Sequence, residues 1–174
     1  MRRGQFVDPH KIMSLCLRYL VEKKNRQGAV VKTVSTTHML NRQAELYDLP
    51  LYERPVGFNH IAALILSDNV LIGGEESGSI SIQGHIPEKD GILACLLIAE
   101  MVAYHGKSLK EQLETLFERT GEVYNCRLDI GLDPTVREAV GEKIASDVRE
   151  FYGRPVQRHD RTDGLKLIFE DGSW

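Results

Sequence analysis

The sequence predicts a three-layer α/β domain with a mostly parallel sheet, followed by a partial α+β unit. Short β-branched runs alternate with helix-length amphipathic stretches up to about Thr120, a pattern typical of βαβ units. After Thr120 the pattern changes to strand, helix and hairpin signals. The composition is that of a folded globular protein, since 42% of the 174 residues are hydrophobic and 27% are charged.

The first domain, expected over residues 4–120, begins with a helix and continues into a strand and a second helix. Asp8-Pro9 predicts the helix start, because Asp caps free N–H groups and Pro fits the first turn. Ala29–Val34 is a β-branched run and predicts a strand. Ser35 or Thr36 is then expected to cap a helix that continues to about Tyr47.

The middle of this domain repeats the alternation. Leu49–Tyr52 predicts a weaker strand, Phe58–Leu66 a third helix, and Val70–Ile72 a compact strand that continues into two glycines. A polar loop is expected from Gly74 to about Lys89.

Two further helices complete the domain. Asp90 is expected to cap the strongly apolar helix Gly91–Tyr104. Ser108 with Glu111 three residues later forms a capping-box pattern for a helix that ends near Thr120.

The second unit, residues 121–174, is predicted to be β-α-β-β. Its Asp-Gly pair between two apolar runs is a strong hairpin signal. The expected elements are a strand over Val123–Ile130, a helix from Asp133-Pro134 to about Val148, and the strands Val156–Asp160 and Leu165–Phe169 around Thr162-Asp163-Gly164.

Several classes of function are excluded by charge and composition. The net charge is −3 and no basic stripe is present, so a nucleic-acid partner is not expected. The longest apolar run, Ile92–Ala99, is too short to span a membrane, and no apolar segment typical of a secretory signal follows the start. Cys16, Cys95 and Cys126 are interpreted as reduced core thiols of a cytoplasmic protein. The six histidines lack metal-site spacing.

The candidate site follows the strand Val70–Ile72, which runs into Gly73-Gly74-Glu75-Glu76-Ser77-Gly78. Ligands of parallel sheets bind beyond the carboxyl ends of the strands. The glycines permit positive φ and close approach of backbone to ligand. A carboxylate can bridge two hydroxyl groups of a sugar through charge-assisted hydrogen bonds. The alternative is a solvated acidic turn.

These residues carry a family resemblance. The loop and the segment that follows it resemble the third domain of the α-D-phosphohexomutases (phosphoglucomutase/phosphomannomutase), which implies a phosphohexomutase-type α/β/α fold with a mixed, mostly parallel sheet. The resemblance extends from about Gly4 to Trp174, and its last part resembles the start of the family's fourth domain. The segments that carry it are Val30–Thr36, Pro55–Phe58, Gly74–Gly78, His85–Gly91, Asp163–Lys166 and Asp171–Trp174.

The resemblance assigns roles within the loop. It implies that Glu75 and Ser77 bind the 3- and 4-hydroxyls of the sugar, and that Gly74 and Gly78 shape the turn. Glu76 is expected either to face solvent or to brace the loop.

Three residues near the loop have two interpretations each. Lys89 either reaches a substrate phosphate or forms a salt bridge with Glu88 or Asp90. His60 either approaches the substrate or is an ordinary helix histidine. His85 either shapes the sugar site or caps its own loop. The family often has Lys where this chain has Asn59, so a positive charge common near the reacting phosphate is missing.

The family's reaction moves phosphate between the 1- and 6-hydroxyls of a hexose. It needs a phosphorylated serine, a magnesium loop of the Asp-x-Asp-x-Asp-Arg type and a phosphate loop of the Arg-x-Ser-Gly-Thr type, and none occurs in this sequence. Mg²⁺ is therefore a family cofactor for which this chain has no ligands, and the chain alone is expected to be inactive.

Three hypotheses remain open. The chain is a fragment of a phosphoglucomutase/phosphomannomutase, a non-catalytic sugar-phosphate binding module, or a structural partner that completes another mutase. The expected partners are accordingly a hexose phosphate and either the missing mutase domains or a second copy in a homodimer, because an incomplete second unit would expose a sheet edge.

Overall fold

A computed structural model describes residue 4 and residues 6–174 of the chain. The chain divides into two compact units, one ending at Asn125 and the other spanning Cys126–Trp174. Gln5, which the expected domain over residues 4–120 includes, lies outside the described residues.

The first unit contains a four-stranded sheet in the order β2-β1-β3-β4. β1 pairs in parallel with β2 and β3, and β4 runs antiparallel to β3, so the sheet is mixed and mostly parallel as predicted. β4 lies in the segment predicted to be a polar loop, where Ile80 and Ile82 pair with Gly74 and Ile72. The strands are β1 (Ala29–Thr33), β2 (Leu51–Arg54), β3 (Val70–Gly74) and β4 (Ile80–Ile82).

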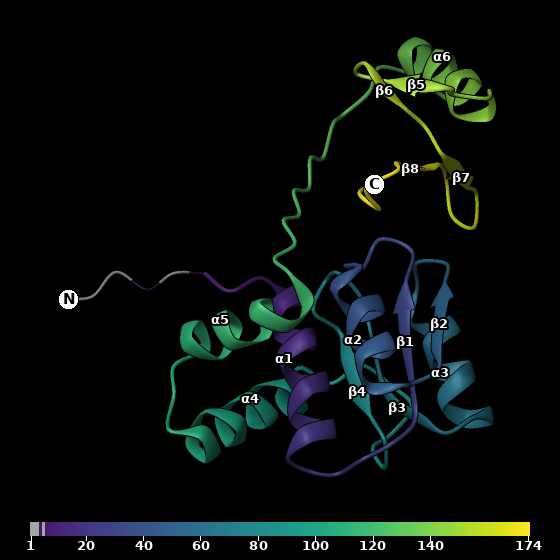
Figure 1. Ribbon diagram of the computed structural model, residues 1–174. Helices are drawn as coiled ribbons and strands as arrows, with labels where there is room; N and C mark the ends of the chain where they lie inside the picture. Colours follow the sequence, from purple (N-terminus) through teal and green to yellow (C-terminus); the bar gives the residue numbers. More distant parts are fainter. Residues whose placement is uncertain (1–3, 5) are drawn as a thin grey trace. The chain divides into compact units, whose positions relative to one another are not determined.

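Helices cover both faces of this sheet and complete the three layers (Figure 1). Neighbouring residues of β1 face opposite layers: Val30 belongs to the larger core with four helices, and Val31 packs with α3. The helices of the larger core are α1 (Pro9–Glu22), α2 (Met39–Tyr47), α4 (Gly91–His105) and α5 (Leu109–Thr120). α3 (Phe58–Ser67) covers the other face through Phe58 and Ile61.

Three predicted helix starts are confirmed by side-chain caps. Asp8 caps α1, Asp90 caps α4, and Ser108 with Glu111 forms the capping box of α5. Each cap satisfies backbone N–H groups that have no partner inside the helix.

The predicted start of α2 is wrong. α2 begins at Met39, whose N–H donates to Thr37 Oγ1 at 3.1 Å. Thr36 instead extends a turn that follows β1, because its backbone N–H donates to the carbonyl of Thr33 at 2.9 Å. Ser35 and Thr36 thus belong to the edge of the sheet, where their hydroxyls have other partners.

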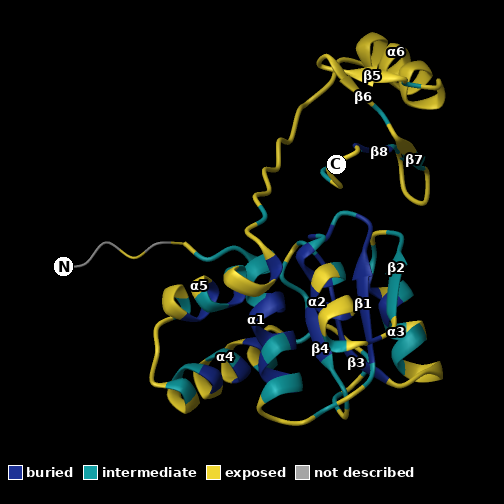
Figure 2. Cartoon of the chain, in the orientation of Figure 1, coloured by how far each residue is buried: buried dark blue, intermediate teal, exposed yellow. Residues whose placement is uncertain are grey.

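The second unit contains one helix and two hairpins. α6 (Pro134–Ala145) begins at the predicted Asp133 cap, but among its described residues none is buried (Figure 2). The predicted hairpin around Gly164 is confirmed, with φ of +75° at that residue. The strands are β5 (Glu150–Phe151) paired with β6 (Arg154–Pro155), and β7 (Arg158–Asp160) paired with β8 (Lys166–Ile168).

The strand predicted over residues 123–130 is wrong, since this segment pairs with no described strand. Its alternating side chains are largely exposed, including Leu128 and Ile130. A strand obtains its ladder hydrogen bonds from a neighbour, and without one the alternating pattern has no sheet to join.

The three thiols are not all core residues. Cys16 is fully buried in the larger core, whereas Cys95 lies on the outer face of α4 and Cys126 on the segment that forms no strand, and both are exposed. No single described helix is long and apolar enough to cross a membrane, and α4 with α5 would reach that length only together, across an 84° bend.

Candidate functional site

The sequence-predicted loop forms the tight connection between β3 and β4, at the edge where β1 and β3 both end. The amide of Gly78 donates to the carbonyl of Glu75 at 3.1 Å, and the amide of Glu75 donates to the carbonyl of Ser79 at 2.9 Å. Gly78 has φ of +96°, a backbone conformation that residues other than glycine rarely adopt. The predicted role of Gly78 in shaping the turn therefore has a conformational basis.

Gly73 and Gly74 are required for a different reason than the one predicted. Neither has a positive φ, and both lie in β3. A Cβ on Gly73 would overlap Cγ2 of Ile61 from α3, and a Cβ on Gly74 would lie 2.7 Å from Sδ of Met13 and 2.9 Å from the Ser79 carbonyl oxygen. These glycines allow helices on both faces to approach the end of the strand.

Glu75 is not part of a solvated acidic turn. Its exposed fraction is 8%, and its Oε1 accepts a hydrogen bond of 2.9 Å from the backbone N–H of Gly57. Gly57 precedes α3 and has φ of +128°. The carboxylate of Glu75 therefore joins the loop to the start of α3.

Glu76 points to a different element. Its Oε2 accepts hydrogen bonds from Ser35 Oγ at 2.7 Å and from Thr33 Oγ1 at 2.9 Å, both at the carboxyl end of β1. Partial burial opposes its ionisation, but the bonds from Ser35 and Thr33 help to outweigh burial and hold the pKa of Glu76 below its usual value. Of the two predicted alternatives, Glu76 braces the loop.

Ser77 is exposed at the tip of the turn. Its hydroxyl lies 3.2 Å from that of Ser79, so the loop presents two neighbouring hydroxyl groups. The sequence analysis did not identify Ser79. The sequence carried no signal for this pair, because the turn at Gly78, with its positive φ, brings the two hydroxyls together.

Of the residues predicted after the loop, His85 contacts its own segment, and the contacts of Lys89 favour neither of its two predicted roles. The backbone N–H of Lys89 donates to Glu88 Oε1 at 2.8 Å, and the Lys89 side chain is exposed. The Nε2 atom of His85 lies 3.0 Å from Oδ2 of Asp90, the residue that caps α4. His85 thus stabilises the loop before α4, which was one of its two predicted roles.

His60 lies in the first turn of α3 and is partly buried. Its N–H donates to the carbonyl of Gly57 at 3.1 Å, so it follows the same turn that Glu75 contacts. Asn59 is exposed beside it, and Oδ1 of Asn59 lies 2.6 Å from the position of a Cβ on Gly57. The start of α3 therefore borders the loop, although α3 and the loop are separate elements in the sequence.

A buried lysine supports this edge and was not identified from the sequence. Lys32 has no exposed surface, and its Nζ lies 2.7 Å from Oε2 of Glu53 and donates to the carbonyl of Thr36 at 2.9 Å. A buried charge requires such partners, because removing an ammonium group from water is costly. The pattern Val-Val-Lys-Thr-Val alone does not show which side chain would meet the lysine.

His10 is a second residue that the sequence analysis missed at this edge. Its Nδ1 accepts a hydrogen bond of 3.1 Å from the N–H of Thr37, which requires an unprotonated Nδ1. Burial lowers the pKa of His10 and outweighs the attraction of Asp8 and Glu76 for the protonated form. The amino end of α1 is thereby attached to the turn after β1.

Residue 4 and residues 6–174 contain no group of three or more His, Cys, Asp or Glu arranged to hold a metal ion. The loop carboxylates Glu75 and Glu76 are directed to Gly57 and to β1 rather than toward a common centre.

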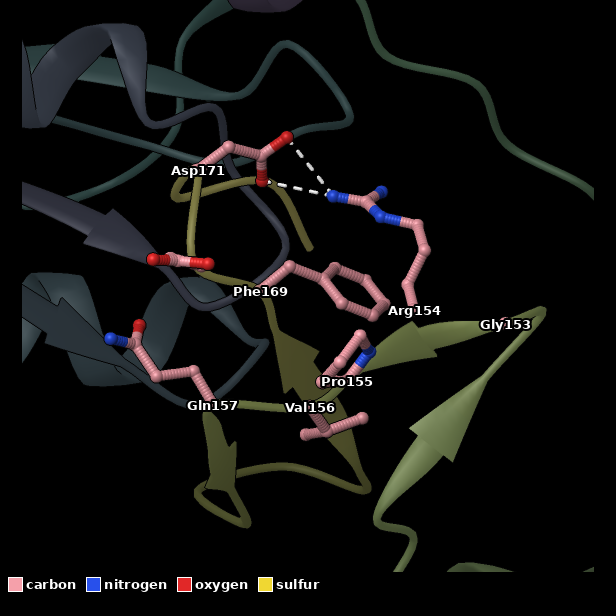
Figure 3. A pocket seen from close by; sticks show the side chains of 8 residues that line it. Gly153, Arg154, Pro155, Val156, Gln157, Phe169 and Asp171 are labelled. Atoms are coloured by element: carbon pink, nitrogen blue, oxygen red, sulfur yellow. Dashed lines mark hydrogen bonds and ion pairs between the residues drawn. The ribbon is translucent and has the colours of Figure 1, made fainter.

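The second unit contains a cavity of about 560 Å³ that includes none of the predicted site residues (Figure 3). Arg154 projects over it, and its Nη2 atom lies 3.0 Å from both carboxylate oxygens of Asp171. The same guanidinium lies over the ring of Phe169 at 4.1 Å. Because the carboxylates Glu170 and Asp171 outnumber Arg154 in its lining, the cavity does not favour a phosphate group, and the loop after β3 remains the better candidate.

Comparisons with known proteins identify the first unit. The family profile described as phosphoglucomutase/phosphomannomutase, alpha/beta/alpha domain III, matches residues 8–120. A phosphoglucosamine mutase of Rubrobacter xylanophilus is 29% identical over 87% of this chain and 34% of its own length. A phosphoglucomutase/phosphomannomutase of Thermococcus kodakarensis is 28% identical over 97% of this chain and 35% of its own.

A solved structure shows the same relationship. A structure from Thermus thermophilus that is assigned as a phosphomannomutase superimposes with a TM-score of 0.73 and 32% identity over 94% of this chain and 33% of that one. The chain therefore spans about a third of the length of the relatives that it matches.

Proposed function

Because the chain belongs to the phosphoglucomutase/phosphomannomutase family, we propose that it provides the hexose-binding part of a phosphohexomutase. The observation that carries this proposal is the loop after β3, in which the start of α3 holds the carboxylate of Glu75 and the exposed hydroxyl of Ser77 follows two residues later. The loop lies at the carboxyl end of β3, where ligands of parallel sheets bind.

In this proposal Glu75 and Ser77 bind neighbouring hydroxyls of the sugar. A carboxylate has about four acceptor positions on its two oxygens, so the bond from Gly57 leaves capacity for sugar hydroxyls. The exposed Ser77 hydroxyl can both donate and accept. The bond from Gly57 also fixes the orientation of the Glu75 carboxylate before the sugar arrives, which reduces the entropy lost on binding.

The chain's own residues do not supply the phosphoryl-transfer chemistry. Such transfer depends on positioning and on stabilisation of the developing charge, and the sequence lacks the family's serine, magnesium-loop and phosphate-loop motifs. We therefore propose that activity requires the remaining mutase domains. Purified chain incubated with glucose 1-phosphate, Mg²⁺ and the bisphosphate activator is expected to give no glucose 6-phosphate.

Binding is tested by titrating the full chain with glucose 6-phosphate while recording backbone amide NMR spectra. We expect shifts at Ser77 and Gly78 with millimolar affinity, on the order of −4 kcal/mol, because a single loop supplies few contacts. Mannose 6-phosphate, with the same 3- and 4-hydroxyls, is expected to bind equally. Galactose 6-phosphate, which inverts the 4-hydroxyl, is expected to bind more weakly.

The variant Glu75→Ala is expected to lose these shifts, and Glu45→Gln is the matched control because Glu45 is exposed on α2. The Glu75→Ala spectrum must keep the dispersion of the folded chain. If wild-type chain shows no loop shifts at sugar-phosphate concentrations well above the millimolar range, or if Glu75→Ala binds as wild type does, the proposed function is wrong.

A second candidate, a structural partner module, is favoured by an exposed apolar stripe on α4. The stripe consists of Ile92, Cys95, Leu96, Ala99 and Ala103, which recur at helical spacing on the side away from the core. Ile92 and Leu96 are 75% and 64% exposed. An apolar helix face of this kind is typical of an interface with another domain or chain.

Analytical ultracentrifugation separates the possible occupants of this stripe. If a second copy covers it, wild-type chain is a dimer and Leu96→Glu is a monomer. If other mutase domains cover it, both proteins are monomers, and addition of those domains forms a complex with wild type only. A monomeric wild-type chain that binds no mutase domains would contradict this second candidate.

A further inference from the structure

The loop that presents Glu75 and Ser77 is attached to the rest of the unit through Glu76. Thr33 and Ser35 donate to one oxygen of this carboxylate at 2.9 and 2.7 Å. These contacts link the loop after β3 to the end of β1, over 43 and 41 residues of sequence. Glu76 stands between the two proposed sugar ligands, so its position sets theirs.

The donors that hold Glu76 are themselves held in place. Thr33 and Thr36 are fully buried, and their hydroxyl oxygens lie 2.7 Å apart. Thr33 has one hydroxyl hydrogen, and because it donates this hydrogen to Glu76, the contact with Thr36 requires Thr36 as the donor. The hydroxyl chain therefore runs in one direction, from Thr36 through Thr33 to Glu76.

The turn that carries these hydroxyls is also held by backbone and lysine hydrogen bonds. The N–H of Thr36 donates to the carbonyl of Thr33 at 2.9 Å, and the buried Lys32 ammonium donates to the carbonyl of Thr36 at 2.9 Å. The carboxylate thus meets a rigid pair of donors. This chain of hydroxyl groups ends in a donated hydrogen and therefore requires an acceptor. An ionised carboxylate is such a group, because it accepts without donating.

We propose that Glu76 is a positioning residue that holds the sugar loop in its binding conformation by anchoring it to the hydroxyls of Thr33 and Ser35. This inference rests on the proposed hexose-binding function of Glu75 and Ser77. Glu76 touches β1 and acts on the sugar only through the orientation of its two neighbours. Its loss releases the loop, and the sugar must then order the loop on binding.

The test uses the full chain and compares Glu76→Gln, Thr33→Val and Thr33→Ser with the surface control Glu45→Gln. Glutamine keeps the shape of Glu76 and one acceptor oxygen but removes the charge that strengthens the bonds from Thr33 and Ser35. Valine keeps the shape of Thr33 without its hydroxyl, and serine restores the hydroxyl. Two measurements are made on each variant: hydrogen exchange of the Glu75 and Gly78 amides, which close the turn, and the affinity for glucose 6-phosphate.

We expect Glu76→Gln and Thr33→Val to speed exchange at the two loop amides and to weaken sugar binding by about fivefold, the cost of ordering one or two side chains. Thr33→Ser and Glu45→Gln should behave as wild type. A general loss of stability would instead speed exchange throughout the sheet, including the amides of β1.

The outcomes separate this inference from the function on which it rests. If wild type binds sugar and Glu76→Gln binds it equally well, the positioning role is wrong and the hexose-binding function stands. If wild type binds no sugar, the proposed function fails, and the anchor is judged by exchange alone. If hydrogen exchange at the amides of Glu75 and Gly78 is unchanged in Glu76→Gln, the anchoring role of Glu76 is wrong.

Discussion

The Oε1 atom of Glu75 accepts a hydrogen bond of 2.9 Å from the backbone nitrogen of Gly57. This bond joins the loop after β3 to the start of α3, which has no side-chain cap of its own. A helix start needs partners for its N–H groups, so Glu75 stabilises the fold as well as presenting the proposed sugar ligand. Any Glu75 variant therefore requires a stability measurement beside its binding measurement.

Gly57→Ala is expected to destabilise the first unit by about 1–3 kcal/mol. Gly57 has φ of +128°, and a Cβ there would lie 2.6 Å from Oδ1 of Asn59. Gly91→Ala is the control, because Gly91 begins α4 without a positive φ and has open space around its Cβ position. Urea unfolding should show little change or a small gain for Gly91→Ala, and equal losses in the two variants would contradict the prediction.

Gly73→Ala is expected to lower the free energy of unfolding by about 1–3 kcal/mol, because the added methyl group overpacks the core. A Cβ at this position would overlap Cγ2 of Ile61, which is fully buried between α3 and the sheet. The double variant Gly73→Ala with Ile61→Ala, which removes the Cγ2 group that the added methyl group would meet, should lose less stability than the sum of the two single variants. Additive losses in the double variant would show that the two groups do not meet.

Glu53→Gln is expected to destabilise the chain more than Lys32→Met. Glu53→Gln removes the counter-charge from a fully buried ammonium, whereas Lys32→Met leaves a carboxylate that is 23% exposed and can be hydrated. Loss of one partner of a buried pair costs about 3–5 kcal/mol, and Glu53→Gln should approach that range. Denaturant unfolding at pH 7 measures the stability loss of each variant. A larger loss for Lys32→Met than for Glu53→Gln would contradict this account of Lys32.

The pH dependence of stability should report the ionisation of Glu76. The folded-state pKa of Glu76 is lowered from 4.5, so its stabilising effect is complete above that value and is lost as the pH falls through the folded-state pKa. The free energy of unfolding of wild type should exceed that of Glu76→Gln by about 1–2 kcal/mol at pH 7. This difference should shrink below pH 4.5. Unfolding curves from neutral to acidic pH measure this difference, and a constant difference would be inconsistent with an ionised anchor.

The thiols should differ in reactivity. Burial raises the pKa of Cys16 to about 12, whereas Cys95 and Cys126 are exposed. A disulfide reagent at about pH 8 is expected to modify two thiols of the native chain rapidly and the third only after unfolding. Rapid modification of all three would show that Cys16 is not shielded by the larger core, and protection of Cys95 would show that the outer face of α4 is covered.

Much of the first unit could be predicted from the sequence because its signals are local. The caps Asp8, Asp90 and Ser108 act on N–H groups two or three residues away, and the structure confirms each. The loop after β3 was placed at the correct end of the strand because the apolar run Val70–Ile72 marks β3, although the strand continues through Gly73 and Gly74. The family resemblance rested on the same loop and is confirmed by the match to residues 8–120.

Predictions failed where the decisive partner lies far along the chain. Ser35 resembles a helix cap, yet its hydroxyl bonds Glu76, 41 residues later. Ile80–Ile82 forms a strand only because β3 lies beside it. Residues 123–130 alternate as a strand does, but pair with no described neighbour.

The sequence by itself determined most elements of the first unit, three of its helix caps and the place of the Glu-Glu-Ser-Gly loop at the end of β3. Only the tertiary structure decided where the loop's carboxylates point: Glu75 to Gly57 and Glu76 to Thr33 and Ser35. The physical reason is that a side chain's direction depends on the hydrogen-bond partners that folding brings to it. Those partners belong to α3 and β1, which only the packing of the sheet and its helices brings to the loop.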